Sequence, residues 1–225
     1  MTEPVELPWD QFIKQWPTRY KQDQHVTIIG PTDCGKTILA QHLVACRGHV
    51  VGTGVKYVDE SLSRLQKQGW HRIERWKDRP RTADRLLLWP NVDNPDDAPK
   101  VHRERFSEML NRVYKDGKWC IWTDELRYLT DNCGMAKIYR NMYISARSNK
   151  VSLVSAAQRP AWVPLEAYSQ AQHLLIHRTG FEDDLKKMLG GHAKELIETV
   201  NQLPWYHFLY ANLRTGERFT TRVAM

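Results

Sequence analysis

The sequence predicts an α/β fold of three layers, in which helices cover both faces of a mainly parallel β-sheet. Short apolar segments of strand character alternate with amphipathic segments of helical period along most of the chain. A β-branched segment at residues 25–29 is followed at once by a glycine-containing loop and then by a helical pattern. We therefore expect a ligand site where the strands end, because open parallel sheets bind ligands at the carboxyl ends of their strands.

The predicted strands are short apolar runs bounded by turn residues. They cover residues 25–29, 50–59, 86–89, 119–123, 151–155 and 173–176, and a final β-hairpin covers residues 206–210 and 218–223. The predicted helices have apolar residues that recur with a helical period. They cover residues 9–20, 37–46, 101–114, 135–147, 184–189 and 193–200, and Pro17 is expected to end the first.

The composition is that of an ordinary globular protein, with 41% hydrophobic and 26% charged residues. No apolar run approaches the length of about 18 residues that a membrane-spanning helix needs, and the acidic, polar start is unlike a signal peptide. Four cysteines without a CxxC spacing predict reduced thiols in the cytoplasm rather than a zinc site. The net charge of +7 suits a nucleic-acid partner but does not require one.

Residues 30–37 match the phosphate-loop pattern GxxxxGK[ST] in full, between a predicted strand and a predicted helix. Two glycines permit backbone angles that turn successive N–H groups toward a phosphate, and the helix start adds its positive dipole end. Lys36 would reach the β- and γ-phosphates of ATP, and the Thr37 hydroxyl would bind Mg²⁺. The predicted nucleotide-binding residues are Gly30, Pro31, Thr32, Asp33, Cys34, Gly35, Lys36 and Thr37.

Asp124 and Glu125 directly follow the predicted strand at residues 119–123. P-loop proteins hold Mg²⁺ with an acid at this place, so Asp124 is the predicted second metal ligand, directly or through water. An adjacent Glu can activate the water that attacks the γ-phosphate, so Glu125 is the predicted catalytic base. An adjacent Asp and Glu at this place distinguish hydrolases from most nucleotide kinases. Alternatively, both acids could cap the helix that follows.

Two polar residues flank the predicted strand at residues 151–155. Gln158 follows it and could bond to the attacking water or to a phosphate oxygen, although it could also be an ordinary turn residue before Pro160. Arg147 ends the preceding helix, where it could stabilise transition-state charge in a neighbouring subunit or interact with the dipole of its own helix. For Arg140, seven residues earlier, the structural role is favoured.

Three segments resemble the FtsK/HerA superfamily of DNA-pumping ATPases, in particular its compact viral genome-packaging branch. They are residues 30–37, residues 119–125 and residues 146–160, in which Arg147, a polar turn and an apolar strand lead to Gln158-Arg159-Pro160. The phosphate loop occurs in many families, whereas the last arrangement is more diagnostic. The resemblance covers residues 26–176.

This resemblance implies a P-loop ATPase of the ASCE type with the strand order 5-1-4-3-2. It also implies Mg²⁺-dependent ATP hydrolysis and a ring of five or six subunits that translocates double-stranded DNA. A portal or another capsid-vertex protein is an implied partner, and the host cytoplasm is the implied location of a viral protein. By the match, Arg147 would act on the nucleotide of a neighbouring subunit, and Gln158 would be the polar sensor.

The chain departs from the family pattern at Asp33 and Cys34, where small residues are common, so nucleotide affinity or redox sensitivity could differ.

A single ATPase domain is expected, with an N-terminal helical extension (1–24), a P-loop core (25–180) and C-terminal helices with the hairpin (181–225). No nuclease, membrane-anchor or winged-helix segment is recognisable. We therefore expect a bare motor that relies on partner proteins.

The candidate DNA-binding segment is residues 61–81, which holds seven Lys or Arg residues against two acids, with two tryptophans between them. Cations of this kind follow phosphates without reading sequence, and the predicted DNA contacts are Lys67, Arg72 and Arg75. The alternative is a solvated helical surface anchored in the core by Trp70 and Trp76.

Packaging of double-stranded DNA is the leading functional prediction. A conjugation, secretion or virion-assembly ATPase that acts on protein or single-stranded DNA is the first alternative. A nucleotide or small-molecule kinase is a second alternative, which Glu125 disfavours. A scaffold that binds ATP without hydrolysing it is a third.

Overall fold

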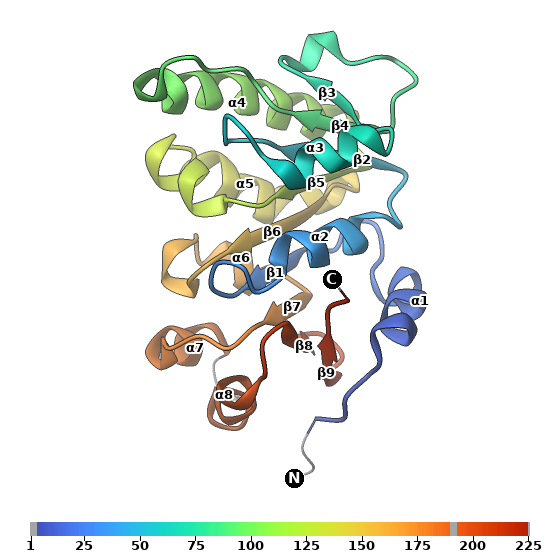
Figure 1. Cartoon of the computed structure of the whole chain (residues 1–225), viewed down its shortest axis with the longest axis vertical. Coiled ribbons are helices and arrows are strands. Elements are labelled where there is room, and N and C mark those ends of the chain that lie inside the picture. Colours follow the sequence, from blue (N-terminus) through green and yellow to red (C-terminus); the bar gives the residue numbers. More distant parts are fainter. Residues whose placement is uncertain (1–3, 190–192, 225) are drawn as a thin grey trace.

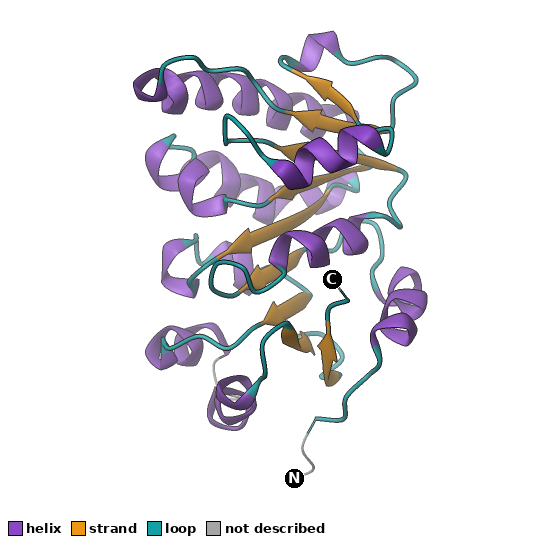
Figure 2. Ribbon diagram, in the orientation of Figure 1, coloured by secondary structure: helices purple, strands orange, loops and turns teal. Residues whose placement is uncertain are grey.

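A nine-stranded sheet lies between layers of helices in the computed structural model, which describes residues 4–189 and 193–224 (Figure 2). The order of its strands is β3-β4-β2-β5-β6-β1-β7-β8-β9. The strands are β1 (Val26–Ile29), β2 (His49–Thr53), β3 (His71–Ile73), β4 (Arg85–Leu88), β5 (Trp119–Thr123), β6 (Ser152–Ala157), β7 (His173–Ile176), β8 (His207–Asn212) and β9 (Arg218–Arg222). The α/β class, the mainly parallel sheet and the C-terminal hairpin are therefore confirmed.

The helices connect and flank these strands. They are α1 (Trp9–Arg19), α2 (Lys36–Val44), α3 (Glu60–Lys67), α4 (Ala98–Asp116), α5 (Ala136–Ser145), α6 (Glu166–Ser169), α7 (Glu182–Leu189) and α8 (Ala193–Gln202). Shorter turns of helix are η1 (Trp76–Asp78), η2 (Pro95–Asp97), η3 (Tyr128–Asn132), η4 (Ala146–Asn149) and η5 (Pro160–Trp162). None of the helices in the described ranges is both long enough and apolar enough to cross a membrane.

The predicted strand order, 5-1-4-3-2, differs from that of the whole sheet because it describes only the five central strands β7-β1-β6-β5-β2. β3 and β4 follow β2 in sequence and extend the sheet beyond it, and the antiparallel hairpin β8–β9 extends the opposite edge beyond β7. The resemblance implied only five strands. The three residues of β3 are too few for a strand pattern, because only Ile73 among them is buried.

β1 to β7 all run parallel to one another, so their carboxyl ends all lie at one edge of the sheet. β1 is central and pairs with β6 on one side and β7 on the other. β5 pairs with β6 and β2. The loops that follow β1, β2, β5 and β6 are therefore neighbours in space, although they are far apart in the sequence.

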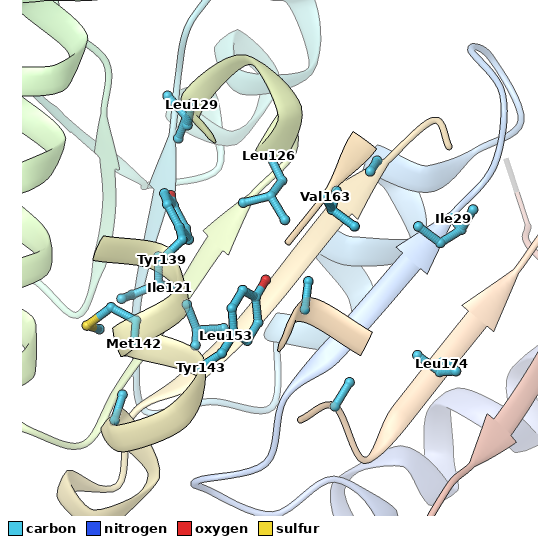
Figure 3. Packing of buried hydrophobic residues seen from close by; sticks show 14 of the residues in the cluster. Ile29, Ile121, Leu126, Leu129, Tyr139, Met142, Tyr143, Leu153, Val163 and Leu174 are labelled. Carbon is cyan, nitrogen blue, oxygen red and sulfur yellow. The ribbon is translucent and has the colours of Figure 1, made fainter. Parts of the chain in front are cut away.

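Two apolar clusters lie on opposite faces of the sheet, because successive side chains of a strand point to opposite faces. One cluster joins the sheet to α1, α2 and α3, and the other joins it to α4, α5, α7 and α8. Figure 1 shows α2 and α3 on one side of the sheet and α4 and α5 on the other. In Figure 3, Tyr139, Met142 and Tyr143 of α5 approach Ile121 of β5 and Leu153 of β6.

Two local predictions need correction. Pro17 does not end the first helix, which continues to Arg19 with the Tyr20 amide bonded to the Trp16 carbonyl at 2.8 Å. Residues 61–81 do not form one helical surface but contribute to α3, β3 and η1. Residues 1–3, 190–192 and 225, which belong to the predicted N-terminal extension and C-terminal region, lie outside the described residues.

Candidate functional site

The loop between β1 and α2 has the geometry of a phosphate cradle. Gly35, with φ of +94°, precedes the first residue of α2, and no side chain caps this helix start. The free N–H groups of the first turn of α2 and the positive end of the α2 dipole therefore face the loop. A Cβ on Gly30 would lie 2.7 Å from the Cys34 Sγ and 2.8 Å from the His177 Cβ, so only glycine fits there.

Lys36 folds over this loop, where its Nζ donates a hydrogen bond to the Pro31 carbonyl at 2.5 Å. A phosphate would offer the ammonium a charged acceptor in the same place. Asp33 adopts a left-handed conformation with φ of +60°, which Asp tolerates better than most residues. Cys34 is buried, and burial raises the pKa of its thiol, so the thiol is not activated for oxidation.

Thr37 and Asp124 meet across the sheet edge, as a shared metal site requires. The Thr37 hydroxyl donates a hydrogen bond to the Asp124 Oδ2 at 2.7 Å, whereas the buried Oδ1 has no hydrogen-bond partner. Burial raises the pKa of Asp124, and the Thr37 hydrogen bond opposes that shift. A carboxylate oxygen without a partner beside a hydroxyl fits Mg²⁺, which prefers oxygen ligands.

Thr37 and Asp124 offer side-chain oxygens to a metal ion here. The described residues contain no group of three or more His, Cys, Asp or Glu side chains placed to hold a metal ion. Mg²⁺ commonly takes one or two protein oxygens and completes its coordination with water and substrate phosphates. The site is therefore suited to a metal that arrives with a nucleotide.

Glu125 lies between two hollows at the carboxyl edge. One, of about 190 Å³, is shared with Gln158, Tyr128 and Trp162. The other, of about 410 Å³, is shared with Lys56 and Tyr57 of the loop after β2. Lys56 and Glu125 form an ion pair with 3.6 Å between Nζ and Oε1.

Gln158 is exposed and lines a further cavity of about 810 Å³, which it shares with the phosphate loop. Its other lining residues include Arg178, Phe181 and Trp205, and the Trp205 indole donates a hydrogen bond to the Asp33 carbonyl at 3.2 Å. Gln158 thus lines one cavity together with the phosphate loop and another together with Glu125. The volume and the mixed aromatic and polar lining suit a nucleotide.

Arg147 is not near the phosphate loop of its own chain. It lies in η4, before the amino end of β6, whereas the phosphate loop follows the carboxyl end of the parallel neighbour β1. The six residues of β6 separate the two edges by about 20 Å. Arg140 lies on α5 and pairs with Glu166 at 3.6 Å, which agrees with the structural role expected for it.

The three predicted DNA contacts lie on or beside different elements. Lys67 ends α3 and Arg75 follows β3, so the two exposed side chains lie at opposite ends of β3. Arg72 lies over the Trp89 ring at 4.3 Å and donates hydrogen bonds to the Trp89 carbonyl and the Asn91 side chain. Trp76 is buried and Trp70 is half-buried, as the alternative of core anchors predicts.

Sequence reasoning missed Lys56, Arg178 and Trp205. Each reaches the carboxyl edge through strand pairing and lies in no recognisable motif. For Lys56, one signal was available, because it lies three residues beyond the end of β2, and β2 pairs with β5 so that Thr53 is opposite Thr123. Glu125 lies two residues beyond Thr123 on the neighbouring strand.

The sequence matches no known family model and no curated protein, but the fold matches solved structures. The genome packaging NTPase B204 from Sulfolobus turreted icosahedral virus 2 matches at a TM-score of 0.67 and 16% identity, over 91% of this chain and 98% of that chain. B204 is also known in complex with AMPPCP and with ATP-gammaS.

Two further structures are similar. VirB4 of Thermoanaerobacter pseudethanolicus matches at a TM-score of 0.69 and 10% identity, over 89% of each chain. The pCW3 conjugation coupling protein TcpA, with ATPgS, matches at 0.55 and 14%, over 88% of this chain and 60% of that chain. All three are FtsK/HerA-type P-loop ATPases, so the resemblance inferred from the sequence is confirmed at the level of the fold.

Proposed function

We propose that this chain, which has the fold of the FtsK/HerA-type P-loop ATPases, is an Mg²⁺-dependent ATPase that translocates double-stranded DNA for viral genome packaging. Residues 30–37 would hold the phosphates of ATP, and the 810 Å³ cavity beside them would hold the nucleoside. The observation that carries the ATPase assignment is the 2.7 Å contact between Thr37 and Asp124, with Glu125 adjacent.

The hydrolytic step follows from the chemistry of these residues. Glu125 accepts a proton from water, and the water oxygen attacks the γ-phosphorus while the bond to the leaving ADP oxygen breaks. Gln158 orients the water, and Lys36 stabilises the negative charge on the phosphate oxygens. Thr37 and Asp124 are the residues that would hold Mg²⁺, which would supply Lewis-acid stabilisation of phosphate charge.

A ring of five or six like subunits would complete the site. Arg147 is about 20 Å from the phosphate loop of its own chain, so it could reach a nucleotide only in a neighbouring subunit. There its guanidinium would stabilise the transition-state charge. A head-to-tail contact, which brings one edge of a subunit to the opposite edge of the next, closes into a ring when the rotation permits.

The DNA part of the proposal has two supports. The chain carries a net charge of +7. Its likeness to a genome packaging NTPase also extends over nearly the full length of that protein. Lys67, Arg72 and Arg75 remain the proposed phosphate contacts, although Arg72 would have to leave Asn91. A portal or another capsid-vertex protein is the proposed docking partner.

The test is steady-state ATP hydrolysis with and without long double-stranded DNA and Mg²⁺, with Glu125→Gln as the blank. We expect turnover that requires Mg²⁺, rises with duplex length and is lost in Glu125→Gln. Turnover equal in the variant and the wild type would exclude the proposed role of Glu125.

The likeness to TcpA, a conjugation coupling protein, favours a second candidate function, in which an ATPase acts on single-stranded DNA or protein. The same assay separates the two functions. Stimulation by single-stranded DNA at least equal to that by duplex DNA would favour the second candidate.

A further inference from the structure

The 190 Å³ hollow beside Glu125 is larger than an attacking water requires. A single water needs only about 30 Å³, whereas the hollow has about 190 Å³. Its wall includes Arg127 and Asn132 from the segment after β5, and Gln158 and Trp162 from the segment after β6. The proposed hydrolysis uses Glu125 and Gln158 and leaves Arg127 without a role.

The Arg127 guanidinium lies over the indole ring of Trp162. Its Cζ is 3.7 Å from the ring centroid, which is the geometry of a cation–π contact. Leu126 and Val163, the sequence neighbours of these two residues, belong to the same buried apolar cluster (Figure 3). The core therefore holds together the two segments that carry the contact, and the contact keeps the cation at the wall of the hollow.

A turn of π-helix places a second donor near Arg127. In η3, the Cys133 amide donates a hydrogen bond to the carbonyl of Tyr128, five residues earlier, at 3.1 Å. Turns of this kind are rare and occur frequently at functional sites. Arg127 and Asn132 are also five residues apart, and both line the hollow. The side-chain amide of Asn132 can donate hydrogen bonds to a ligand there.

The N–H donors of the hollow are mostly unused. Arg127 has one ion pair, in which its Nε lies 3.5 Å from the Asp131 Oδ2, and the two side chains are 48% and 57% exposed. Among the described residues, the two Nη groups of Arg127 and the side-chain amides of Asn132 and Gln158 have no hydrogen-bond partner. An anion with several oxygens could accept from all three side chains, and a guanidinium is suited to phosphate.

Hydrolysis itself would change the charge of the hollow. Before the reaction, the negative charge of Glu125 offsets the positive charge of Arg127. In the proposed reaction the attacking water gives a proton to Glu125, so the hollow has a net positive charge at the moment when inorganic phosphate forms. When Glu125 passes this proton to solvent, its negative charge returns and repels the phosphate.

We propose that this hollow is the first binding site of the inorganic phosphate that hydrolysis releases, with Arg127 as its charged ligand and Asn132 as a further donor. The inference rests on the proposed function and deepens it, because it assigns a place to the second product and a means of expelling it. ADP would remain on the phosphate loop while phosphate leaves through the hollow.

Calorimetric titration with inorganic phosphate tests this site without hydrolysis. The protein is saturated with ADP and Mg²⁺, and the dissociation constant of phosphate is measured for the wild type and for Glu125→Gln, whose neutral amide imitates the protonated acid. We expect Glu125→Gln to bind phosphate at least about fivefold more tightly, because one repelling charge is removed. Adding Arg127→Ala should weaken that binding by about tenfold or more, the scale of a hydrogen bond to a charged group.

Two further variants in the Glu125→Gln background serve as controls. Asp131→Asn should tighten phosphate binding by about twofold, because it frees Arg127 from a surface ion pair, and it should have no effect when Arg127 is absent. Arg112→Ala, which removes an exposed arginine of α4, should leave the affinity unchanged. Equal phosphate affinity with and without Arg127, or an equal loss in Arg112→Ala, would overturn the inference.

Product inhibition gives a second readout in the active protein. Arg127→Ala should raise the phosphate concentration that halves turnover by about tenfold, whereas Arg127→Lys, which keeps the charge, should raise it less. The affinity for a nonhydrolysable ATP analogue should stay nearly unchanged in both variants. If Arg127→Ala weakens the binding of that analogue as much as the binding of phosphate, Arg127 is a ligand of ATP and the inference is overturned.

The two proposals fail in different ways. A wild type that hydrolyses no ATP would refute the proposed ATPase, and the titration would still decide whether Arg127 binds phosphate. A wild type that hydrolyses ATP, but whose phosphate affinity does not depend on Arg127, would overturn only the present inference.

Discussion

The buried carboxylate of Asp124, the proposed metal ligand, opposes the stability of the folded chain. Its Oδ1 is buried without a hydrogen-bond partner, and Thr37 satisfies only the other oxygen. A buried carboxylate without enough partners costs free energy when it is ionised. The site is therefore strained electrostatically in the absence of a cation.

The pH dependence of unfolding should reveal this cost. Burial raises the pKa of Asp124 from its ordinary value of 3.8, so its contribution to stability is present at lower pH and is lost as pH rises through the folded-state pKa. Compared with the nucleotide-free wild type, Asp124→Asn should therefore gain stability as pH rises above about 4. Taking the difference between the two proteins cancels the contributions of the other titrating groups.

The measurement is urea unfolding of both proteins, followed by circular dichroism from pH 4 to pH 8. A difference in unfolding free energy that does not change with pH would contradict the burial argument. Mg²⁺ with a nonhydrolysable ATP analogue should reverse the order, because a ligand that binds the folded wild type stabilises it by mass action. Asp124→Asn should gain little from the same ligands.

Elements differed in how far the sequence could specify them. β1, β5, β6 and β7 are fully buried apolar runs, and the phosphate loop is specified by its own eight residues, so local patterns were sufficient. β3 has three residues, and its position depends on pairing with β4. The strand order likewise depends on which strands meet, and no local pattern records that.

Some residues of the candidate site could likewise be predicted from local sequence patterns, and others could not. Lys36, Thr37, Asp124 and Glu125 were predictable because motif spacing places them on known ends of strands and helices. Lys56 was not, because it approaches Glu125 only through the pairing of β2 with β5. Arg72 was predicted as a DNA contact from charge alone, and charge could not reveal that Trp89 and Asn91 already engage it.

Trp16 is one of the buried residues that attach helix α1 to the sheet. This side chain is 1% exposed, and its indole donates a hydrogen bond to the Leu43 carbonyl of α2 at 2.9 Å. Its ring also lies near those of Tyr20, His173 and Tyr210. One residue of α1 therefore joins α2, β7 and β8.

Trp16→Ala should lower the free energy of unfolding by about 3–5 kcal/mol, since it removes a large buried side chain and leaves a cavity. Lys14→Ala, an exposed change on the same helix, should alter it by less than about 0.5 kcal/mol. Urea unfolding followed by circular dichroism measures both. A loss below about 1 kcal/mol for Trp16→Ala would mean that α1 is not an integral part of the fold.

The whole molecule separates its functional groups between two edges of the sheet. The carboxyl edge holds the phosphate loop, Asp124, Glu125 and Gln158, whereas Arg147 lies at the amino edge. The described residues include no ion-pair partner for Arg147, whereas Arg140 on the adjacent helix pairs with Glu166. The proposed role of Arg147 requires a side chain at this edge that can contact another subunit.

Mixing two inactive variants tests whether Arg147 acts between subunits. Arg147→Ala should bind ATP but lose turnover by about 10³-fold or more, the usual effect of losing such an arginine, and Lys36→Ala should lose turnover because its own phosphate loop fails. In a head-to-tail ring of both variants, a subunit with an intact Lys36 can sit beside a neighbour with an intact Arg147.

Random mixing at equal amounts creates that pairing at about a quarter of the sites, so turnover should peak near a one-to-one ratio at up to about a quarter of the wild-type rate. Arg147→Ala mixed with the double variant Lys36→Ala/Arg147→Ala should stay inactive, because no subunit then offers the arginine. Arg140→Ala alone should remain active, since that side chain is engaged with Glu166 in its own chain. Mixed rings without any recovery would show that Arg147 does not act between subunits, and the interaction with its own helix dipole would then account for it.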